Sequence, residues 1–483
     1  MRIIIVGAGR TGIQLTRFLI KENHEISLIE LNEERARHAS NRLDCMVIHD
    51  DGNNLAALEE AGAVKADALV CVTDSDEVNM IICALAASRY SGLLKIARVR
   101  NDDYLRLYRH ASPDQRIMGI DYFIHPDVEA SKVALRALSH GALGNILDFA
   151  GTSYELGSID VAEGSAFDGL CMKDYHSLVK EMSLVTLVER EGANSRECIL
   201  PSGSTALRKG DRAYILAQEN RIEHIFRLAG RVEKPLRRIG IVGGGHIGVL
   251  IAEGLLRDSG NGKDEEEKKK NDVFSWVNQF KFRSNRRLVI IEQDSALCKE
   301  LAGRFPEALI LNSDISDESF IAEERLGNLD LIITATANQE LNIITAIYLK
   351  SRGVKRAIAM VNGSGYGTIA QQLGVDVVIP MESVMVDSIL SHLMGESIRA
   401  VHHIGDGTLV IMEMTITDDS PAVNKAIKEF NILGGGLIIL VNRDEASFIP
   451  RGDYVFESGD RIILIVKNDS DAELEGFFGK GRT

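Results

Sequence analysis

An apolar segment that runs into a glycine-rich turn occurs twice in this chain and constrains its fold more than any other feature. The segment RIIIVGAGRTG begins at residue 2, and RIGIVGGGHIG begins at residue 238. In each copy the motif G-x-G-x-x-G lies between a predicted strand and a predicted amphipathic helix; its glycines are Gly7, Gly9 and Gly12, then Gly243, Gly245 and Gly248. Such glycines permit a tight turn, close approach of a pyrophosphate and tight packing of helix on strand. The sequence therefore predicts a duplicated dinucleotide-binding unit.

The duplication continues beyond the glycines. An acid, Glu30 or Glu292, ends the next apolar run in each half. At this position a carboxylate accepts hydrogen bonds from ribose hydroxyls and disfavours a 2′-phosphate. Asp51 and Asp314 follow at similar spacing and are predicted either to contact the ligand or to act as helix N-caps. Thr73 and Thr336 end the strands after that, where they face the ligand or serve as caps.

Strands rich in Val and Ile alternate with helical patterns in both halves, which predicts the α/β class with parallel sheets. We expect two Rossmann-like nucleotide-binding domains, at residues 1–140 and 236–400, each followed by a small α+β domain, at residues 141–231 and 401–483. The small domains share short alternating strands and the turns Gly210-Asp211 and Gly459-Asp460. A charged insertion at about 258–286 is typical of a solvated loop, although its FSWVNQFKF segment would also suit a partner contact.

Composition excludes several classes of function. The net charge of −15 argues against nucleic acid as a partner, because phosphate binding requires a basic face. No apolar run is long enough to span a membrane. The six cysteines form no C-x-x-C pair and the twelve histidines no H-x-x-x-H pair, so the spacing predicts no metal site. We find no catalytic acid or base pattern and predict that the chain is not an enzyme.

Residues that differ between the two halves predict different ligand preferences. Arg10 and Arg98 in the first half correspond to His246 and Met360 in the second, and Asp74 corresponds to an alanine. Arginine binds phosphate oxygens with a fork of donors, whereas an unperturbed imidazole is mostly uncharged near neutral pH. The first site is therefore expected to prefer the more anionic nucleotide.

Taken together, the doubled glycine motifs, IHDDG (48–52), CVTDSDEVN (71–79), KIARVRN (95–101) and the paired Gly-Asp turns resemble TrkA-type proteins. These are cytosolic regulatory subunits of bacterial and archaeal Trk potassium-uptake systems. The resemblance covers essentially the whole chain and implies two RCK (regulator of potassium conductance) N-domains and two RCK C-domains. It also implies NAD(H) or ATP/ADP as ligands, and assembly of copies into a ring on the inner face of the membrane against a Trk-type pore.

The same resemblance implies which residues would bind the nucleotides. The first site would comprise Gly7, Ala8, Gly9, Arg10, Thr11, Glu30, Asp51, Gly52, Thr73, Asp74 and Arg98. The second would comprise Gly243, Gly244, Gly245, His246, Ile247 and Glu292, with Asp314 and Thr336.

Two alternatives stay open at the level of sequence. The chain could be an NAD-dependent oxidoreductase with a substrate pocket that no motif reveals. It could also be a nucleotide-sensing scaffold for a partner other than a potassium transporter.

Overall fold

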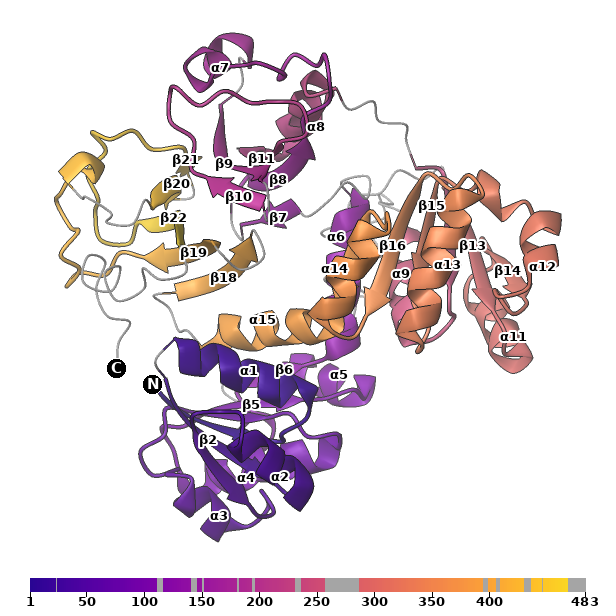
Figure 1. Ribbon diagram of the computed structural model, residues 1–483. Coiled ribbons are helices and arrows are strands. Elements are labelled where there is room, and N and C mark those ends of the chain that lie inside the picture. The colour runs from indigo at the N-terminus through magenta and orange to yellow at the C-terminus, as the bar shows by residue number, and fades with distance from the viewer. Residues whose placement is uncertain are drawn as a thin grey trace. The chain divides into compact units, whose positions relative to one another are not determined.

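The computed structural model describes most of the chain and divides it into two compact units (Figure 1). One unit comprises Met1–Ala142 with Pro235–Ile389, and the other comprises Leu143–Lys234 with Leu390–Thr483. The described residues are 1–22, 24–110, 116–139, 146–149, 152–179, 182–192, 196–230, 236–256, 286–393, 398–404, 409–429, 436–444 and 446–467. The charged insertion predicted at about 258–286 lies, apart from its last residue, outside them.

The first half of the first unit is a six-stranded parallel sheet in the order β3-β2-β1-β4-β5-β6. Its strands are β1 (Arg2–Val6), β2 (Glu25–Glu30), β3 (Met46–His49), β4 (Ala68–Cys71), β5 (Leu94–Arg98) and β6 (Tyr122–Ile124). Its helices are α1 (Arg10–Lys21), α2 (Glu33–Ser40), α3 (Leu55–Glu60), α4 (Asp76–Arg89), α5 (Asp102–His110), the short η1 (Ile117–Gly119) and α6 (Pro126–Ser139). The isoleucines of β1 are fully buried, as expected for a parallel strand covered on both faces.

The second half repeats this sheet in the order β14-β13-β12-β15-β16-β17. Its strands are β12 (Arg238–Val242), β13 (Arg287–Glu292), β14 (Leu309–Asn312), β15 (Leu331–Thr334), β16 (Arg356–Val361) and β17 (Val377–Pro380). Its helices are α9 (His246–Leu256), α11 (Ser295–Arg304), α12 (Glu318–Glu323), the short η4 (Leu326–Asn328), α13 (Gln339–Ser351), α14 (Ser364–Gln372) and α15 (Met381–Leu393). Two Rossmann-like sheets in one chain confirm the predicted α/β class.

The two sheet domains share one hydrophobic core, because helices from each cross onto the other. Helix α6 packs on α9. The contact is close, because a Cβ added to Gly254 of α9 would lie only 2.4 Å from Cδ1 of Leu135 in α6. The side chains of Leu135 and Leu250 belong to the same buried cluster. By the repeat, α15 lies beside α1, where Gln14 donates to the Ser383 hydroxyl at 3.2 Å (Figure 1). The duplicated domains are thus a pseudo-symmetric pair.

The second unit holds two small antiparallel sheets with matching strand order, β10-β9-β11-β8-β7 and β21-β20-β22-β19-β18. The first sheet has β7 (Ile146–Asp148), β8 (Tyr154–Asp160), β9 (Ser183–Glu191), β10 (Arg196–Ile199) and β11 (Arg212–Gln218), with α7 (Met172–Leu178) and α8 (Glu219–Leu228). The second has β18 (Ile398–Ile404), β19 (Leu409–Thr415), β20 (Leu437–Arg443), β21 (Ala446–Phe448) and β22 (Arg461–Lys467), with the short η5 (Ile427–Glu429). Apolar residues of both sheets form one buried cluster.

The Gly-Asp turns that revealed the repeat of the small domains have a structural role. The carboxylate of Asp211 accepts two hydrogen bonds from the Arg190 guanidinium, at 2.8 and 2.6 Å. Asp460 accepts two from Arg443, at 2.6 and 2.7 Å. Both carboxylates are buried, and such bidentate pairs combine charge with fixed geometry. Each pair ties the turn to the neighbouring strand.

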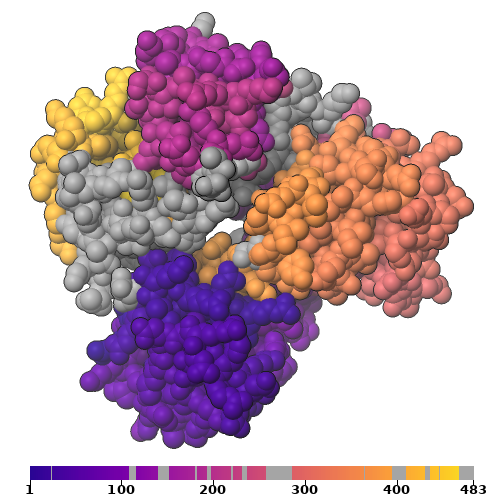
Figure 2. All heavy atoms as spheres, in the orientation of Figure 1, coloured from indigo at the N-terminus to yellow at the C-terminus, as the bar shows by residue number. Residues whose placement is uncertain are grey.

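Among the described residues, no helix is long and apolar enough to cross a membrane. The space-filling view shows one face of the first sheet domain, coloured from indigo to violet (Figure 2).

The glycine motifs generate a prediction about stability. A Cβ on Gly12 would lie 1.9 Å from the Gly7 carbonyl oxygen, and one on Gly248 would lie 2.1 Å from that of Gly243. Because backbone cannot yield as a side chain can, Gly12→Ala and Gly248→Ala should each cost about 1–3 kcal/mol or more. Thermal denaturation should show lower transition temperatures for both variants.

Gly9→Ala is the matched control for this prediction. Its φ is −70° and a Cβ there meets no atom within 4 Å, so its transition should stay near that of the parent. Equal transitions for Gly9→Ala and Gly12→Ala would contradict the packing role of the third glycine.

Candidate functional site

The glycine loops lie at the carboxyl ends of β1 and β12, where the strand order of each sheet reverses. Open parallel sheets bind ligands at this switch point. Gly7 and Gly243 have φ of +108° and +103°, a region that favours glycine. Gly9 and Gly245 face open space, since a Cβ on either would meet no atom within 4 Å. The loops therefore leave room for a ligand to approach their backbone.

Helix α1 presents its first turn to this space without a side-chain cap. Its N-cap is Gly9, which has no side chain to satisfy the first amide groups, and the first turn, with Arg10 and Thr11, contains no acidic residue. Free amide groups and the positive end of the helix dipole together favour a phosphate at this position. Gly7 to Gly12 therefore form the turn between β1 and the first turn of α1, and their binding of a pyrophosphate stays a prediction.

The acid that ends the second strand of each half makes the same contacts with the backbone in both halves. Glu30 accepts hydrogen bonds from the backbone amide of Ala8 at 2.6 Å and from that of Asn32 at 2.8 Å. Glu292 accepts from the amides of Gly244 at 2.7 Å and Asp294 at 2.9 Å. Each carboxylate therefore fastens a glycine loop to the end of the neighbouring strand. This positioning role was not evident from the sequence, which suggested only the contact with ribose.

A buried asparagine supports each threonine of the predicted site. Asn79 accepts hydrogen bonds from the Thr73 amide at 2.9 Å and hydroxyl at 2.7 Å, and its own amide donates to the carbonyls of Thr73 and Arg98. Asn342 makes the same bonds to Thr336, at 2.9 and 2.7 Å. Sequence reasoning assigned no role to these asparagines, although their alignment in the repeat could have revealed them. They link two strand ends next to each glycine loop.

The arginine that distinguishes the first half is largely buried at this edge of the sheet. The Arg98 side chain is 11 % exposed, and its Nη1 lies 3.6 Å from the Asp74 carboxylate. Burial and the neighbouring Arg100 lower the pKa of Arg98, which Asp74 partly offsets. Met360 takes the corresponding position in the second half and belongs to the apolar core. The predicted asymmetry of charge therefore exists beneath the site.

Of the two roles left open for Asp51 and Asp314, helix capping is wrong, and contact with a ligand stays a prediction. Asn54 caps α3 and Asp317 caps α12. Asp51 instead accepts from the Asn53 amide at 3.0 Å, and Asp314 accepts from the amide and hydroxyl of Ser316. The aspartates lie at the ends of the third strands, where they shape the loops before the helices.

Gly52, next to Asp51, packs closely below the first loop. A Cβ there would lie 2.6 Å from Val6 Cγ1 and 2.9 Å from Ile82 Cδ1. Together with the loop, Glu30 and Thr73, the Asp51-Gly52 segment surrounds the carboxyl end of β1. In the second half, Gly243 to Gly248, Glu292, Asp314 and Thr336 lie correspondingly around the end of β12.

The fourth residue of each glycine motif contacts the opposite half. Arg10 Nη1 lies 3.4 Å from the Glu382 carboxylate, and His246 Nδ1 lies 3.0 Å from the Asp127 carboxylate. By the register of the last two strands, Glu382 and Asp127 are equivalent positions. The repeat thus makes reciprocal contacts, of which neither was predicted from the sequence.

His246 is not in the environment of an unperturbed imidazole, which the comparison of the two loops assumed. Its Nε2 lies 3.1 Å from Asp102 while its Nδ1 contacts Asp127. Burial lowers the pKa of His246, but hydrogen bonds and charge from the two aspartates outweigh it and raise the pKa to about 9. The imidazolium is nevertheless paired with two carboxylates, so it adds little net positive charge to the second loop.

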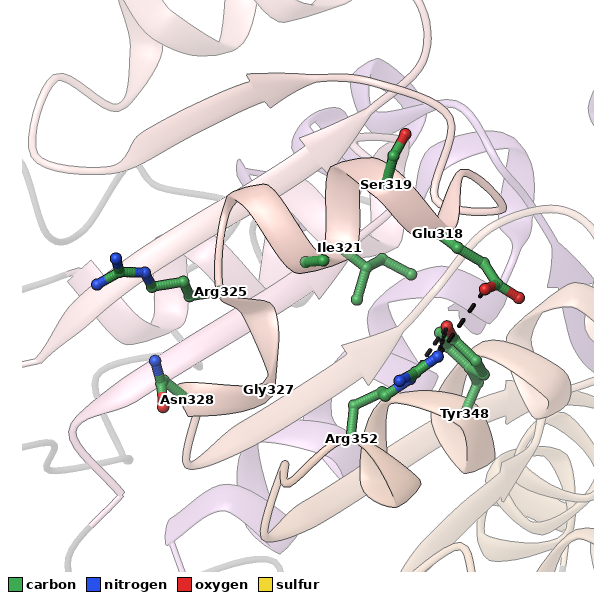
Figure 3. Close-up of a pocket in the computed structure, with 9 residues that line it drawn as sticks. Glu318, Ser319, Ile321, Arg325, Gly327, Asn328, Tyr348 and Arg352 are labelled. Atoms are coloured by element: carbon green, nitrogen blue, oxygen red, sulfur yellow. Dashed lines mark hydrogen bonds and ion pairs between the residues drawn. The ribbon is translucent and has the colours of Figure 1, made fainter.

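A shallow pocket of about 500 Å³ lies elsewhere in the second sheet domain (Figure 3). It is lined by residues of α12, η4 and the end of α13, including Arg325, Tyr348 and Arg352. The Arg352 guanidinium donates to the Tyr348 hydroxyl at 2.8 Å. Because η4 precedes β15, this pocket is at the amino ends of the strands and is separate from the nucleotide loops.

These features define a class of protein with two tandem Rossmann-like domains. The glycine loop of each domain contacts an acidic residue in the first turn of the last helix of the other domain. Its family is shown by comparison. The TrkA-N domain matches residues 3–126 and 277–380, and the TrkA-C domain matches residues 411–479. The chain belongs to the TrkA family.

Relatives match over nearly the full chain. The Trk system potassium uptake protein TrkA of Azorhizobium caulinodans is 26 % identical over 479 residues, covering 99 % of this chain and 98 % of that protein. The TrkA homologue of Archaeoglobus fulgidus is 28 % identical over 478 residues, covering 99 % and 100 %. The family recognised from sequence motifs is therefore confirmed.

Solved structures show the same fold. The GsuK channel bound to NAD matches with a TM-score of 0.55 at 17 % identity, covering 99 % of this chain and 78 % of that chain. The crystal structure of the GsuK RCK domain matches with a TM-score of 0.55 at 16 % identity, covering 98 % and 94 %.

The double role of the acid gives a prediction for Glu30. Glu30→Ala leaves the amides of Ala8 and Asn32 without their acceptor, which should cost about 1–3 kcal/mol of stability. We expect a lower denaturation midpoint, together with weaker binding of NAD(H) by calorimetry. Glu34→Ala, at an exposed position of α2, is the control and should leave both unchanged. Unchanged stability of Glu30→Ala would contradict the role of this carboxylate in holding the loop.

Proposed function

We propose that this chain is the nucleotide-binding regulatory subunit of a membrane potassium uptake transporter, and that it binds nucleotide without turnover. The observation that carries the proposal is the pair of glycine loops, each with an open second glycine and a fixed carboxylate, in a chain that matches TrkA proteins from end to end. The relatives are named as potassium uptake proteins, which supports potassium uptake as the process that this chain regulates. Nucleotide binding at the two glycine loops would be the regulatory signal.

NAD(H) is the ligand we propose for these sites, with ATP or ADP as the other candidates. All three share an adenosine ribose, which Glu30 or Glu292 would bind with the lone pairs that the backbone leaves free, and a pyrophosphate, which suits the open loops. Gly12 and Gly248 allow the first turn of the helix to pack directly against the glycine loop that would hold the pyrophosphate. A chain of the same fold is described as a channel bound to NAD, which is in keeping with this choice.

Regulation requires that nucleotide favour one arrangement of the protein over another. The fourth residue of each loop contacts the opposite sheet domain, so a phosphate at either loop would compete for Arg10 or rearrange the surroundings of His246. Such competition couples ligand to the pairing of the two domains. We propose that copies assemble into a ring on the cytoplasmic face of the membrane, where this pairing is transmitted to a Trk-type pore.

The central test combines binding with transport. Gly9→Asp and Gly245→Asp each place a carboxylate in the open space of one loop, where it should repel phosphate and abolish nucleotide binding at that site by calorimetry. Potassium uptake by cells that carry the pore and the variant should lose its response to nucleotide, while Gly9→Ala retains more of it. Uptake that responds normally with both loops blocked would overturn the regulatory proposal.

The same preparation separates this proposal from its alternatives. NADH mixed with the protein and a panel of small carbonyl compounds should keep its absorbance; steady loss of NADH would favour the oxidoreductase. Normal nucleotide binding with no capture of a Trk-type pore in detergent would favour a scaffold for another partner.

The two sites should also differ in preference for charge. Arg10 is largely exposed and makes only a 3.4 Å contact with Glu382, which a phosphate could displace, whereas His246 lies between two aspartates. Arg10→Ala should therefore weaken ATP more than adenosine at the first site, and added salt should reduce the difference. His246→Ala should change that ratio little at the second. Each site is measured with the other blocked by Gly245→Asp or Gly9→Asp, and equal ratios at both sites would refute the asymmetry.

A further inference from the structure

We propose that Asp102, His125 and His246 form a binding site for a divalent transition metal of the Zn²⁺ and Co²⁺ class, held between the two sheet domains. One potential ligand atom from each residue lies within 4.8 Å of those from the other two. Asp102 and His125 come from the first sheet domain and His246 from the glycine loop of the second. The sequence predicted no metal site, because the three residues are far apart in the chain and follow no ligand spacing.

Asp102 stands at the centre of the cluster. One of its carboxylate oxygens lies 3.1 Å from Nε2 of His246, and the other lies 3.4 Å from Nε2 of His125. The two imidazole rings are 5.0 Å apart, centre to centre, and tilted by 46°. A metal bound at about 2.0–2.2 Å from nitrogen and oxygen ligands brings them to within about 3.5 Å of one another. The ligand atoms, which lie within 4.8 Å of one another, would therefore draw together by up to about 1.3 Å to close on an ion.

The surroundings of His246 match those of a metal-bound histidine. Its second ring nitrogen, Nδ1, is 3.0 Å from the Asp127 carboxylate. Histidines that bind metal usually donate this second N–H to a carboxylate, which fixes the ring and strengthens the ligand. Asp127 is therefore a positioning residue, and His246 would present Nε2 to the metal.

His125 is almost completely buried beside Asp102. Its side chain is 1 % exposed, and Nδ1 is buried without a hydrogen-bond partner among the described residues. Oδ1 of Asp102, likewise buried, also lacks one. The ring is held by a 2.7 Å contact of Nε2 with the Arg100 carbonyl, which has to be exchanged for the metal if this nitrogen is the ligand. Unpaired buried polar atoms are costly, and an ion bound between His125 Nε2 and Asp102 would give Oδ1 of Asp102 a partner.

Charge and donor type select the ion. Two carboxylates, Asp102 and Asp127, face the site. The positive charges that interact with Asp127 from the first sheet domain are those of Arg98 and Arg100. A dication would neutralise the carboxylates more fully than a single proton on His246. Imidazole with carboxylate suits Zn²⁺, Co²⁺ or Ni²⁺, whereas Mg²⁺ and Ca²⁺ prefer oxygen ligands alone. The partial exposure of Asp102 and His246 leaves space for water as a further ligand.

The repeat supplies an internal comparison. At the equivalent positions of the other half, Ser364, Pro380 and Arg10 replace Asp102, His125 and His246. Proline offers no ligand and arginine repels a cation. The proposal therefore predicts one metal ion per chain rather than two.

Co²⁺ titration of the full-length chain, freed of any affinity tag and treated with chelator, tests this directly. We expect a visible absorption band that saturates at one Co²⁺ per chain and is bleached by equimolar Zn²⁺. His125→Gln and His246→Gln should each weaken Co²⁺ binding at least tenfold, and Asp127→Asn about 10–100-fold. His176→Gln, on α7 in the other unit, is the control and should bind as the parent does. Circular dichroism establishes that each variant is folded.

Two results would overturn the proposal. Absence of a saturable band would show that the cluster holds only a protonated imidazole. A band that persists in folded His246→Gln would show that Co²⁺ binds elsewhere. Mg²⁺ should not compete at equal concentration, and competition by Mg²⁺ would contradict the imidazole ligands. None of these measurements depends on nucleotide binding or transport, so the inference stands apart from the proposed function.

Discussion

The contact on which the rest of the structure depends is the approach of each third glycine to the carbonyl of the first. At Gly12 and Gly248 the backbone of the helix passes so close to the loop that a single methyl group would collide with it. This approach sets the start of α1 and α9 and therefore the direction of their free amide groups. Glu30 and Glu292 then fix the loops from the other side through backbone hydrogen bonds. Short-range backbone packing and these two carboxylate acceptors thus hold each loop in place.

The duplication has a consequence that a single domain cannot have. Helices α6 and α9 join two sheet domains through one core, which brings the fourth residue of each loop against the first turn of the partner domain's last helix. Because the two copies have diverged, the contacts differ: arginine with one glutamate on one side, histidine with two aspartates on the other. A nucleotide at one loop and an ion beside the other would act on the same interface. On the two proposals made above, the pseudo-symmetric pair would receive two distinct inputs at one interface.

Local sequence patterns were sufficient to predict the fold class and the family, but not the structural role of each residue around the glycine loops. The two parallel, Rossmann-like sheets and the glycine turns follow from runs of Val and Ile and from glycines at fixed spacing, and the structure confirms this fold class. The boundaries of the four domains and the ligand residues stay predictions. Capping by Asp51 and Asp314 was predicted wrongly because Asn54 and Asp317, a few residues on, begin the helices instead. Turn-forming residues are interchangeable over such short distances.

The sequence by itself determined that this chain contains two dinucleotide-type loops and belongs to the TrkA family, because both properties reside in residues that are near neighbours along the chain. Only the tertiary structure brings Asp102, His125 and His246 together and places His246 between two aspartates. Those residues are far apart in sequence, and their environment depends on how two folded domains pack. Solvation and hydrogen bonding at an interface are properties of the packed chain, so no local pattern encodes them.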